Sequence, residues 1–341
     1  MRSILFPLLC GFWMMTFIMP RATGQETKPL RAGMIGLDTS HAPAFAKLLN
    51  GPEAIGELAG VKVVAAFPGG SPDLPASADR VADYTKQFAE MGIEIVPSID
   101  VLLTKVDVVL LESVDGRPHL AQALAVLKAK KPVFIDKPVA GSLADAVAIF
   151  EVAKRLNVPC FSSSSLRFSR GIQAMRNDPR VGNVVGCDAH GPCSLEPHHP
   201  DLFWYGIHGV ETLFTIMGPG CAAVTRVQSE GTEFVVGRWS DGRIGTFRGL
   251  RSGAAGYGAT VFGTKGIAPS GGYDGYQPLV VEIVKFFKTG KPPVTAEETL
   301  EIYAFMEAAD ESKREKGAPV TIASVLEKAR KIAAEKKLAG Q

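Results

Sequence analysis

The chain has 341 residues, enough for two domains that each bury a hydrophobic core. With 46% hydrophobic and 21% charged residues, it has the composition of a soluble globular protein, which excludes a disordered chain or a membrane protein with several spans. Removing residues 1–24 takes away Arg2 and Arg21 and no acid, and the neutral chain that remains argues against binding to nucleic acid.

The first 24 residues resemble a secretory signal peptide. Arg2 precedes an apolar run over residues 4–19, and the small-residue pattern that ends at Gly24 resembles a cleavage site. We expect a Sec-type signal peptide that is cleaved after Gly24, export to the periplasm or the extracellular space, and no other membrane contact. An uncleaved N-terminal anchor is the alternative, because the run is barely long enough to span a bilayer.

Residues 29–165 alternate apolar runs with helical segments. We expect strands at 30–35, 61–67, 93–96, 106–112, 132–135 and 159–164, and helices at 40–49, 79–91, 118–130 and 143–156. Strands and helices that alternate with short connections predict a Rossmann-like, doubly wound parallel sheet in an α/β fold.

The pattern changes over residues 166–337. Alternating runs between residues 184 and 250 are separated by glycine-rich turns, and residues 240–243 form a good hairpin turn. Helices are expected at 278–289, 296–316 and 322–337. These features predict an α+β domain with an open mixed or antiparallel sheet, one face of which is free for a substrate or a second subunit.

The turn after the first strand is an imperfect dinucleotide fingerprint. The pattern G-x-G-x-x-G is represented by Gly36, Asp38 and His41. Like charges about 4 Å apart in a partly screened site repel by roughly 4 kcal/mol, so Asp38 must turn away, pair with a cation or exclude the phosphate. The acid that holds the ribose is also missing, and Ser71 with Arg80 is an alternative site for the 2′-phosphate of NADP.

Two segments carry candidate catalytic groups. Lys137 directly follows an expected buried strand, so its ammonium group should lie at the carboxyl edge of the sheet, where ligands bind in such folds. His208 and Glu211 are three residues apart on an expected helix and share a face. A histidine accepts a proton near neutral pH, and a neighbouring carboxylate would orient it.

These landmarks together resemble the Gfo/Idh/MocA family of glucose-fructose oxidoreductases and inositol dehydrogenases. MIGLDTSH falls at the family's glycine-rich turn, VFIDKP is similar to its Glu-Lys-Pro signature, and YGIHGVETLFTIMG is similar to its active-site helix. The resemblance implies that Lys137 binds substrate and handles a proton together with His208. The family's acid four residues before this histidine is replaced by Trp204, and Tyr205 is the alternative hydroxyl group.

The resemblance implies NAD or NADP as the cofactor and a small carbohydrate as the substrate. The implied catalytic residues are Lys137, His208, Glu211 and Tyr205, and the implied cofactor-binding residues are Gly36, Leu37, Asp38, Ser40, His41, Ser71, Ser113, His119, Asp136 and Lys137. We therefore expect an NAD(P)-dependent oxidoreductase acting on a sugar, polyol or sugar derivative. An exported glycosidase or lyase of the same fold, and a non-catalytic carbohydrate-binding protein, are the rival hypotheses.

Four cysteines follow the signal segment: Cys160, Cys187, Cys193 and Cys221. Cys187 and Cys193 could form a disulfide in an exported protein, or all four could be core residues. Between residues 187 and 201, Cys, His and acidic residues offer every usual zinc ligand, but their spacing matches no zinc pattern. We predict no metal site, and interpret this segment as a polar loop lining a sugar site, with Trp204 and Tyr205 stacking on the sugar ring.

Overall fold

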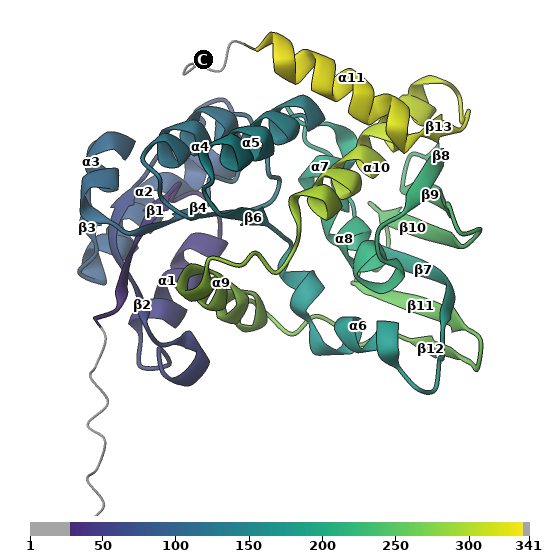
Figure 1. Ribbon diagram of the computed structural model, residues 1–341, viewed down its shortest axis with the longest axis horizontal. Coiled ribbons are helices and arrows are strands. Elements are labelled where there is room, and N and C mark those ends of the chain that lie inside the picture. The colour runs from purple at the N-terminus through teal and green to yellow at the C-terminus, as the bar shows by residue number, and fades with distance from the viewer. Residues whose placement is uncertain (1–27, 337–341) are drawn as a thin grey trace, which may run out of the picture.

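A computed structural model describes residues 28–336 and contains two sheets, each covered by helices (Figure 1). The predicted signal peptide at 1–24 lies outside the described residues and stays a prediction, as does Lys337 at the end of the last expected helix. Among the residues described, no helix has the length and hydrophobicity that a membrane-spanning segment needs.

The first sheet has six parallel strands in the order β3-β2-β1-β4-β5-β6. Its strands are β1 Leu30–Ile35, β2 Val61–Phe67, β3 Glu94–Ile95, β4 Val108–Leu111, β5 Val133–Ile135 and β6 Cys160–Ser162. The connecting helices are α1 His41–Asn50, α2 Pro75–Glu90, α3 Ile99–Lys105, α4 His119–Lys128 and α5 Leu143–Leu156, with a 3₁₀ turn η1 at Gly56–Leu58. The predicted doubly wound parallel sheet is therefore confirmed.

Two apolar cores enclose this sheet. Side chains of α3, α4 and α5 pack on one face, whereas α1 and α2 pack on the other. Helix α9, Gln277–Thr289, lies with α1 on that second face and contributes Leu279, Ile283 and Phe286 to its core (Figure 1). The sequence assigned this helix to the second domain, but its apolar stripe completes the first sheet's covering layer.

The second sheet has seven strands in the order β12-β11-β7-β10-β9-β8-β13. Its strands are β7 Val184–Pro192, β8 Cys221–Ser229, β9 Thr232–Trp239, β10 Ile244–Leu250, β11 Gly258–Gly263, β12 Ile267–Pro269 and β13 Val320–Thr321. Strands β7 and β10 pair in parallel and the other neighbours are antiparallel, which confirms the predicted mixed sheet.

Helices cover one face of the second sheet and leave the other open (Figure 1). The remaining helices are α6 Arg170–Gln173, α7 Asp201–Trp204, α8 Gly206–Met217, α10 Ala296–Arg314 and α11 Ile322–Glu335, with 3₁₀ turns η2 Ser165–Phe168 and η3 Ala174–Asn177. Side-chain caps start several of them. Thr295, for example, accepts a hydrogen bond from the Glu298 amide at the start of α10.

The four cysteines in the described chain are buried and free. The disulfide alternative for Cys187 and Cys193 is therefore wrong. Cys187 points from β7 into the apolar core, and Cys193 packs against the backbone of Gly249. Both act as small core residues.

Candidate active site

A cavity of about 360 Å³ lies at the carboxyl ends of the first sheet's strands, facing α8 of the second domain. This is where ligands bind in open parallel sheets, and the volume falls in the range of small-molecule sites. The lining residues are Thr39, Ser40, His41, Ala76, Arg80, Val114, Lys137, Ser165, Leu166, Trp204, Tyr205, His208, Tyr257, Tyr273 and Tyr276. They bring together three of the four predicted catalytic residues, namely Lys137, Tyr205 and His208.

Lys137 reaches the cavity because it follows β5 by two residues. Lys137 is 8% exposed, and its ammonium nitrogen lies 5.7 Å from the centre of the Tyr205 ring. An ammonium group at this distance is attracted to the face of an aromatic ring. Tyr205 therefore helps to hold Lys137 at the cavity wall.

His208 is positioned by α8 and by a glycine that follows it. A Cβ on Gly209 would lie 2.1 Å from a ring carbon of Phe247, so only glycine allows α8 to pack this closely on β10. The His208 Nδ1 atom shares a hydrogen bond of 2.7 Å with the Ser164 hydroxyl group. Burial, followed by the positive charge of Lys137, lowers the pKa of His208 well below its usual value, so the ring is neutral at pH 7.

Glu211 does not orient His208, contrary to the sequence expectation. Its carboxylate accepts a hydrogen bond from Ser163 and forms a buried ion pair with Arg167, which also binds Glu298. The i, i+3 spacing places the two side chains on one face of α8, but the Arg167 guanidinium group draws the carboxylate away from the cavity. Glu211 is thus a structural residue, and Ser164 takes the position expected for it.

Asp38 turns away from the cavity, the first of the three outcomes considered from the sequence. It is fully buried and accepts hydrogen bonds from the Ser77 hydroxyl group and the Val114 amide, at 2.6 and 2.9 Å. Gly36, with φ of 90°, lies beneath the β4–α4 loop, where a Cβ would come within 2.4 Å of the Ser113 nitrogen. Burial raises the pKa of Asp38, and these two hydrogen bonds oppose that effect.

The first turn of α1 faces the cavity through Ser40 and His41. Ser40 occupies the N-cap position without a side-chain bond to the helix, and instead shares a 3.4 Å hydrogen bond with Tyr276. Arg80, on α2, lines the same cavity and forms no ion pair within residues 28–336. A helix N-terminus next to a free guanidinium group suits a phosphate.

Four other predicted cofactor-binding residues do not line the cavity. Leu37 packs in the apolar core, and the Ser71 hydroxyl group donates to Asp115 at 2.6 Å. The Ser113 hydroxyl group donates to Gln122. His119 is fully buried, and its two ring nitrogens lie 2.9 and 3.3 Å from backbone carbonyl oxygens, so it braces the β4–α4 loop and does not line the cavity.

Asp136, also predicted to bind cofactor, lies beneath the cavity wall. Its carboxylate is 2.7 Å from the Nδ1 atom of His41. Glu112, which directly follows β4, completes a buried group with these two residues and was not predicted from the sequence. Burial, followed by repulsion from Asp136, raises the pKa of Glu112 well above its usual value.

The polar loop at 193–201 docks on the first domain and does not line the cavity, which corrects the sequence interpretation. His199 is buried and lies 3.0 Å from Glu196 and 3.2 Å from Asp115. The exposed His198 pairs with Glu196 and lies 3.6 Å from Asp73. Only the residues after this loop, Trp204 and Tyr205, reach the cavity as predicted.

Three further tyrosines, Tyr257, Tyr273 and Tyr276, line the cavity and were not predicted from the sequence. Together with Tyr205, they bring four of the chain's six tyrosines to this one cavity. They follow one another at ring distances of 6.4 and 6.0 Å. The available signal was their clustering in a short glycine-rich stretch, since glycine-rich loops place exposed aromatic rings on a surface.

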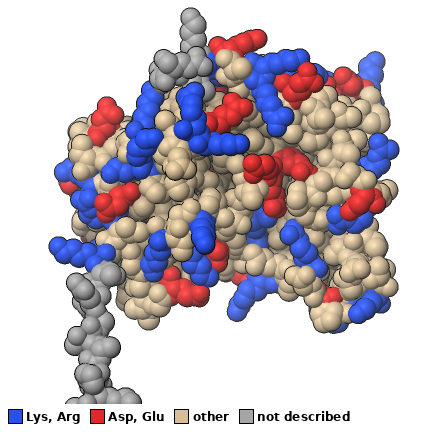
Figure 2. Space-filling model, viewed as in Figure 1, with Lys and Arg blue, Asp and Glu red and all other residues tan. Residues whose placement is uncertain are grey.

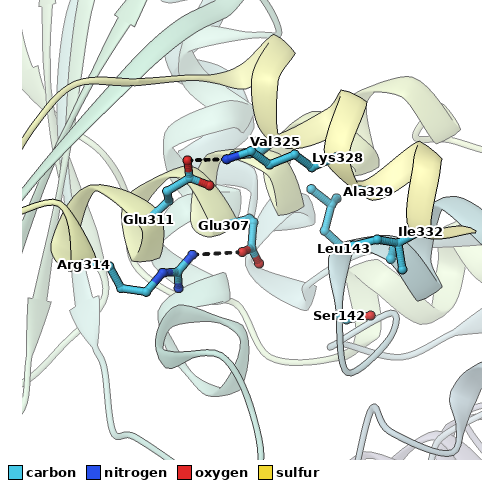
Figure 3. A pocket seen from close by; sticks show the side chains of 10 residues that line it. Ser142, Leu143, Glu307, Glu311, Arg314, Val325, Lys328, Ala329 and Ile332 are labelled. Carbon is cyan, nitrogen blue, oxygen red and sulfur yellow. Dashed lines mark hydrogen bonds and ion pairs between the residues drawn. The ribbon is translucent and has the colours of Figure 1, made fainter.

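A second hollow lies far from these residues, between α5, α10 and α11 (Figure 3). An ion pair joins Lys328 of α11 to Glu311 of α10, and a second pair, Arg314 with Glu307, lies along α10. It contains no predicted site residue. On the face shown in Figure 2, basic and acidic side chains are interspersed, so this face carries no single basic surface suited to nucleic acid.

Comparisons with known proteins agree with this architecture. Residues 30–164 match a family described as an oxidoreductase family with an NAD-binding Rossmann fold, Gfo/Idh/MocA. Comparison with curated protein sequences gave no match. A scyllo-inositol dehydrogenase from Lactobacillus casei, solved with NAD(H) and scyllo-inositol, is 16% identical with a TM-score of 0.71, over 87% of this chain and 100% of that chain.

Two further solved structures are similar over the same extent. An oxidoreductase from Agrobacterium radiobacter, in complex with NAD⁺, L-tartaric acid and magnesium, is 16% identical with a TM-score of 0.69, over 87% of this chain and 100% of that chain. An NAD-binding protein from Listeria innocua is 17% identical with a TM-score of 0.66, over 86% and 97% of the two chains. At these identities the structural likeness establishes the fold alone.

The sheet, its glycine turn and the cavity at its carboxyl edge are features of a Rossmann-like nucleotide-binding fold. Residues 30–164 match the Gfo/Idh/MocA family, and this match agrees with the resemblance recognised from the sequence. The prediction of NAD or NADP agrees with the NAD-binding fold of that family.

Proposed function

We propose that the protein is an NAD(P)-dependent oxidoreductase acting on a sugar, a polyol or a sugar derivative. The observation that carries this proposal is the single cavity shared by Lys137, His208 and the first turn of α1. A proton-handling pair and a phosphate-binding helix end lie on its walls, which is the arrangement that hydride transfer to or from an alcohol needs. The bound polyol in the similar inositol dehydrogenase supports this substrate class.

The residues present fit a dinucleotide. The Asp38 carboxylate, which would repel a pyrophosphate, is directed into the protein and hydrogen-bonded there. The amides at Ser40 and His41, together with Arg80, would hold the phosphates. Because Ser71 is bonded to Asp115, Arg80 alone remains to receive a 2′-phosphate.

A bound nicotinamide ring supplies or accepts the hydride, and the chain supplies the proton chemistry. Lys137 would hold the substrate hydroxyl group and stabilise negative charge on its oxygen. His208, kept neutral by burial, is able to accept the proton. Tyrosine rings on the cavity wall offer flat apolar surfaces for the C–H face of a sugar.

No specific observation favours the rival enzymes. A glycosidase with the usual mechanism needs two carboxyl groups on either side of the bond that it breaks. None of the 15 residues lining the cavity is acidic. The remaining rivals, a glycosidase or lyase that recycles a bound cofactor and a carbohydrate-binding protein without catalysis, are separated by experiment.

The first test is whether the purified protein binds nucleotide. Denaturing it and analysing the supernatant would reveal tightly bound NAD or NADP, and thermal unfolding with each added nucleotide would reveal exchangeable binding. We expect release of a nucleotide or a rise in melting temperature with one of the two. If neither occurs, the oxidoreductase proposal fails.

The second test is turnover on a panel of polyols and sugars with the preferred nucleotide. Lys137→Met should abolish turnover, with the melting temperature preserved, because it removes only the ammonium group at the cavity wall. Lys128→Met, an exposed lysine on α4, is the matched control and should be fully active. Nucleotide binding without turnover on any substrate would favour the non-catalytic rival.

We also propose that the open face of the second sheet binds a second copy of the chain. Val227 and Ile244 on this face are 62% and 54% exposed, and Phe234 and Phe262 accompany them. Exposed apolar patches on a sheet commonly mark an interface. Analytical ultracentrifugation should detect a dimer or larger oligomer, and Ile244→Lys should weaken it; a monomeric wild-type protein would contradict this proposal.

We also propose that the protein is exported from the cytoplasm. A Sec-type signal peptide over residues 1–24 would deliver the chain unfolded, so any cofactor would bind after export. N-terminal sequencing of the protein from the periplasm or medium of an expressing bacterium should begin at Gln25. Retention in the cytoplasm with Met1 intact would contradict it.

A further inference from the structure

Three buried side chains converge beneath the cavity, each placed by a different strand of the first sheet. His41 begins the helix after β1, Glu112 directly follows β4, and Asp136 directly follows β5. One ligand atom from each lies within 4.8 Å of the other two. Atoms bound to one ion at about 2.1 Å are about 3 to 4 Å apart, so small inward shifts would complete a coordination site.

Glu112 is the strongest evidence for a ligand. Its side chain is fully buried, and neither carboxylate oxygen has a hydrogen-bond partner within residues 28–336. Asp38, a fully buried acid at the same edge of the sheet, has two donors. Buried charged groups in proteins are paired or bind metals, so an ionised Glu112 without a donor suits a bound cation.

The contact between His41 and Asp136 points the same way. The Nδ1 and Oδ2 atoms are 2.7 Å apart, yet they lack the alignment that a hydrogen bond requires. A neutral imidazole nitrogen and a carboxylate oxygen can both donate an electron pair to a metal ion. An ion bound by both, and by Glu112, would satisfy all three groups.

We propose that His41, Glu112 and Asp136 bind a divalent first-row transition metal ion such as Mn²⁺ or Zn²⁺. One imidazole and two carboxylates suit such ions, and the two carboxylates balance the ionic charge. Three protein ligands leave at least one coordination position open, which is typical of a catalytic metal site.

The site adjoins the cavity, because His41 and Lys137, the residue after Asp136, both line it. A metal ion there would bind an oxygen atom of a ligand in the cavity. The proposal rests on this geometry and not on the oxidoreductase activity. Metal binding can therefore be measured without nucleotide or substrate.

The test is calorimetric titration of the full, EDTA-treated protein with MnCl₂ and, separately, ZnCl₂. We expect one ion per chain with at least one of the two metals, and a rise in melting temperature on binding. Glu112→Gln and Asp136→Asn should each weaken binding by about tenfold or more, because each removes a ligand. Glu112→Gln is a nearly isosteric change that leaves no buried charge, and circular dichroism will verify that it folds.

His198→Asn is the matched control. His198 lies with Glu196 and Asp73 in an exposed histidine-carboxylate group that could bind metal adventitiously. The control should bind metal as the wild-type protein does. The proposal is overturned by absence of binding of both metals, by unchanged affinity in Glu112→Gln, or by loss of binding in His198→Asn alone; Glu112 would then hold a proton.

Discussion

At the scale of single residues, two buried acids at the carboxyl edge of the first sheet differ in their hydrogen-bond partners. Asp38 is directed into the protein and saturated with hydrogen bonds, whereas Glu112 has no donor within the described chain. Neither lines the cavity, so the charges that face a ligand there are cationic, from Arg80 and Lys137. The sequence shows that these acids are present but not which way they point, since the partners of Asp38 come from α2 and from the β4–α4 loop.

The role of Asp38 can be tested directly. Asp38→Ala leaves the Ser77 hydroxyl group and the Val114 amide without an acceptor, so we expect the free energy of unfolding to fall by about 1–3 kcal/mol. Nucleotide affinity should stay within about twofold, because the lost carboxylate does not face the cavity. Urea denaturation and nucleotide titration measure the two effects.

The exposed Asp79 provides the matched control, and Asp79→Ala should change neither property. A large gain in nucleotide affinity in Asp38→Ala would contradict the observed geometry. It would show that the carboxylate repels the phosphate, as the sequence first suggested.

Site residues were predictable to different extents for physical reasons. Lys137 was predictable because the end of a parallel strand fixes the edge where the next side chains emerge. The surroundings of His119 and Glu211 were not predictable, because spacing along a helix does not reveal which distant groups a side chain contacts. His119 contacts backbone carbonyl groups, and Glu211 pairs with Arg167. The tyrosines Tyr257, Tyr273 and Tyr276 lie in loops with no periodic signal, so only the tertiary fold brings them to the cavity.

At the scale of elements, the second sheet is joined to its helices by a buried ion cluster around Arg226. This side chain, in β8, is fully buried and binds Glu233 of β9 at 2.6 Å and Asp201 of α7 at 2.8 Å, as well as Asp310 of α10. The strand was predicted from its alternating pattern, but that pattern does not distinguish Arg226 from an exposed polar residue. Its burial was not predictable, because three acids from three distant elements make it favourable.

Breaking this cluster should be costly. Arg226→Met leaves the buried Asp310 without a basic partner in the described chain, while Glu233 keeps Arg251, and we expect a loss of about 3–5 kcal/mol in the free energy of unfolding. Arg330→Met, at an exposed arginine on α11, should change stability by less than about 0.5 kcal/mol. Chemical denaturation of both variants is the measurement, and equal stabilities would contradict a structural role for the cluster.

At the scale of the whole molecule, several contacts hold the domains around the cavity, and two of them could not be predicted from the sequence. Helix α9 returns from the second part of the chain to cover the first sheet, and the 193–201 loop docks through His199 on Asp115. Both sheets were predictable from periodicity, since each repeats a local pattern. The return of α9 was not, because an amphipathic helix fits any apolar face.

The contact between the loop and Asp115 should make the free energy of unfolding depend on pH in the acidic range. Burial raises the pKa of Asp115, but hydrogen bonds from His199, Arg117 and Ser71 outweigh it and hold that pKa well below its usual range. The unfolded chain binds the proton more readily, at about pH 3.9, so this stabilisation is complete above that pH and is lost as the pH falls toward the folded-state pKa. We expect Asp115→Asn to be less stable than the wild type at pH 7 and to lose less stability between pH 7 and pH 3, as measured by thermal unfolding. Parallel pH profiles of the two proteins would show that Asp115 does not carry the contact between the domains.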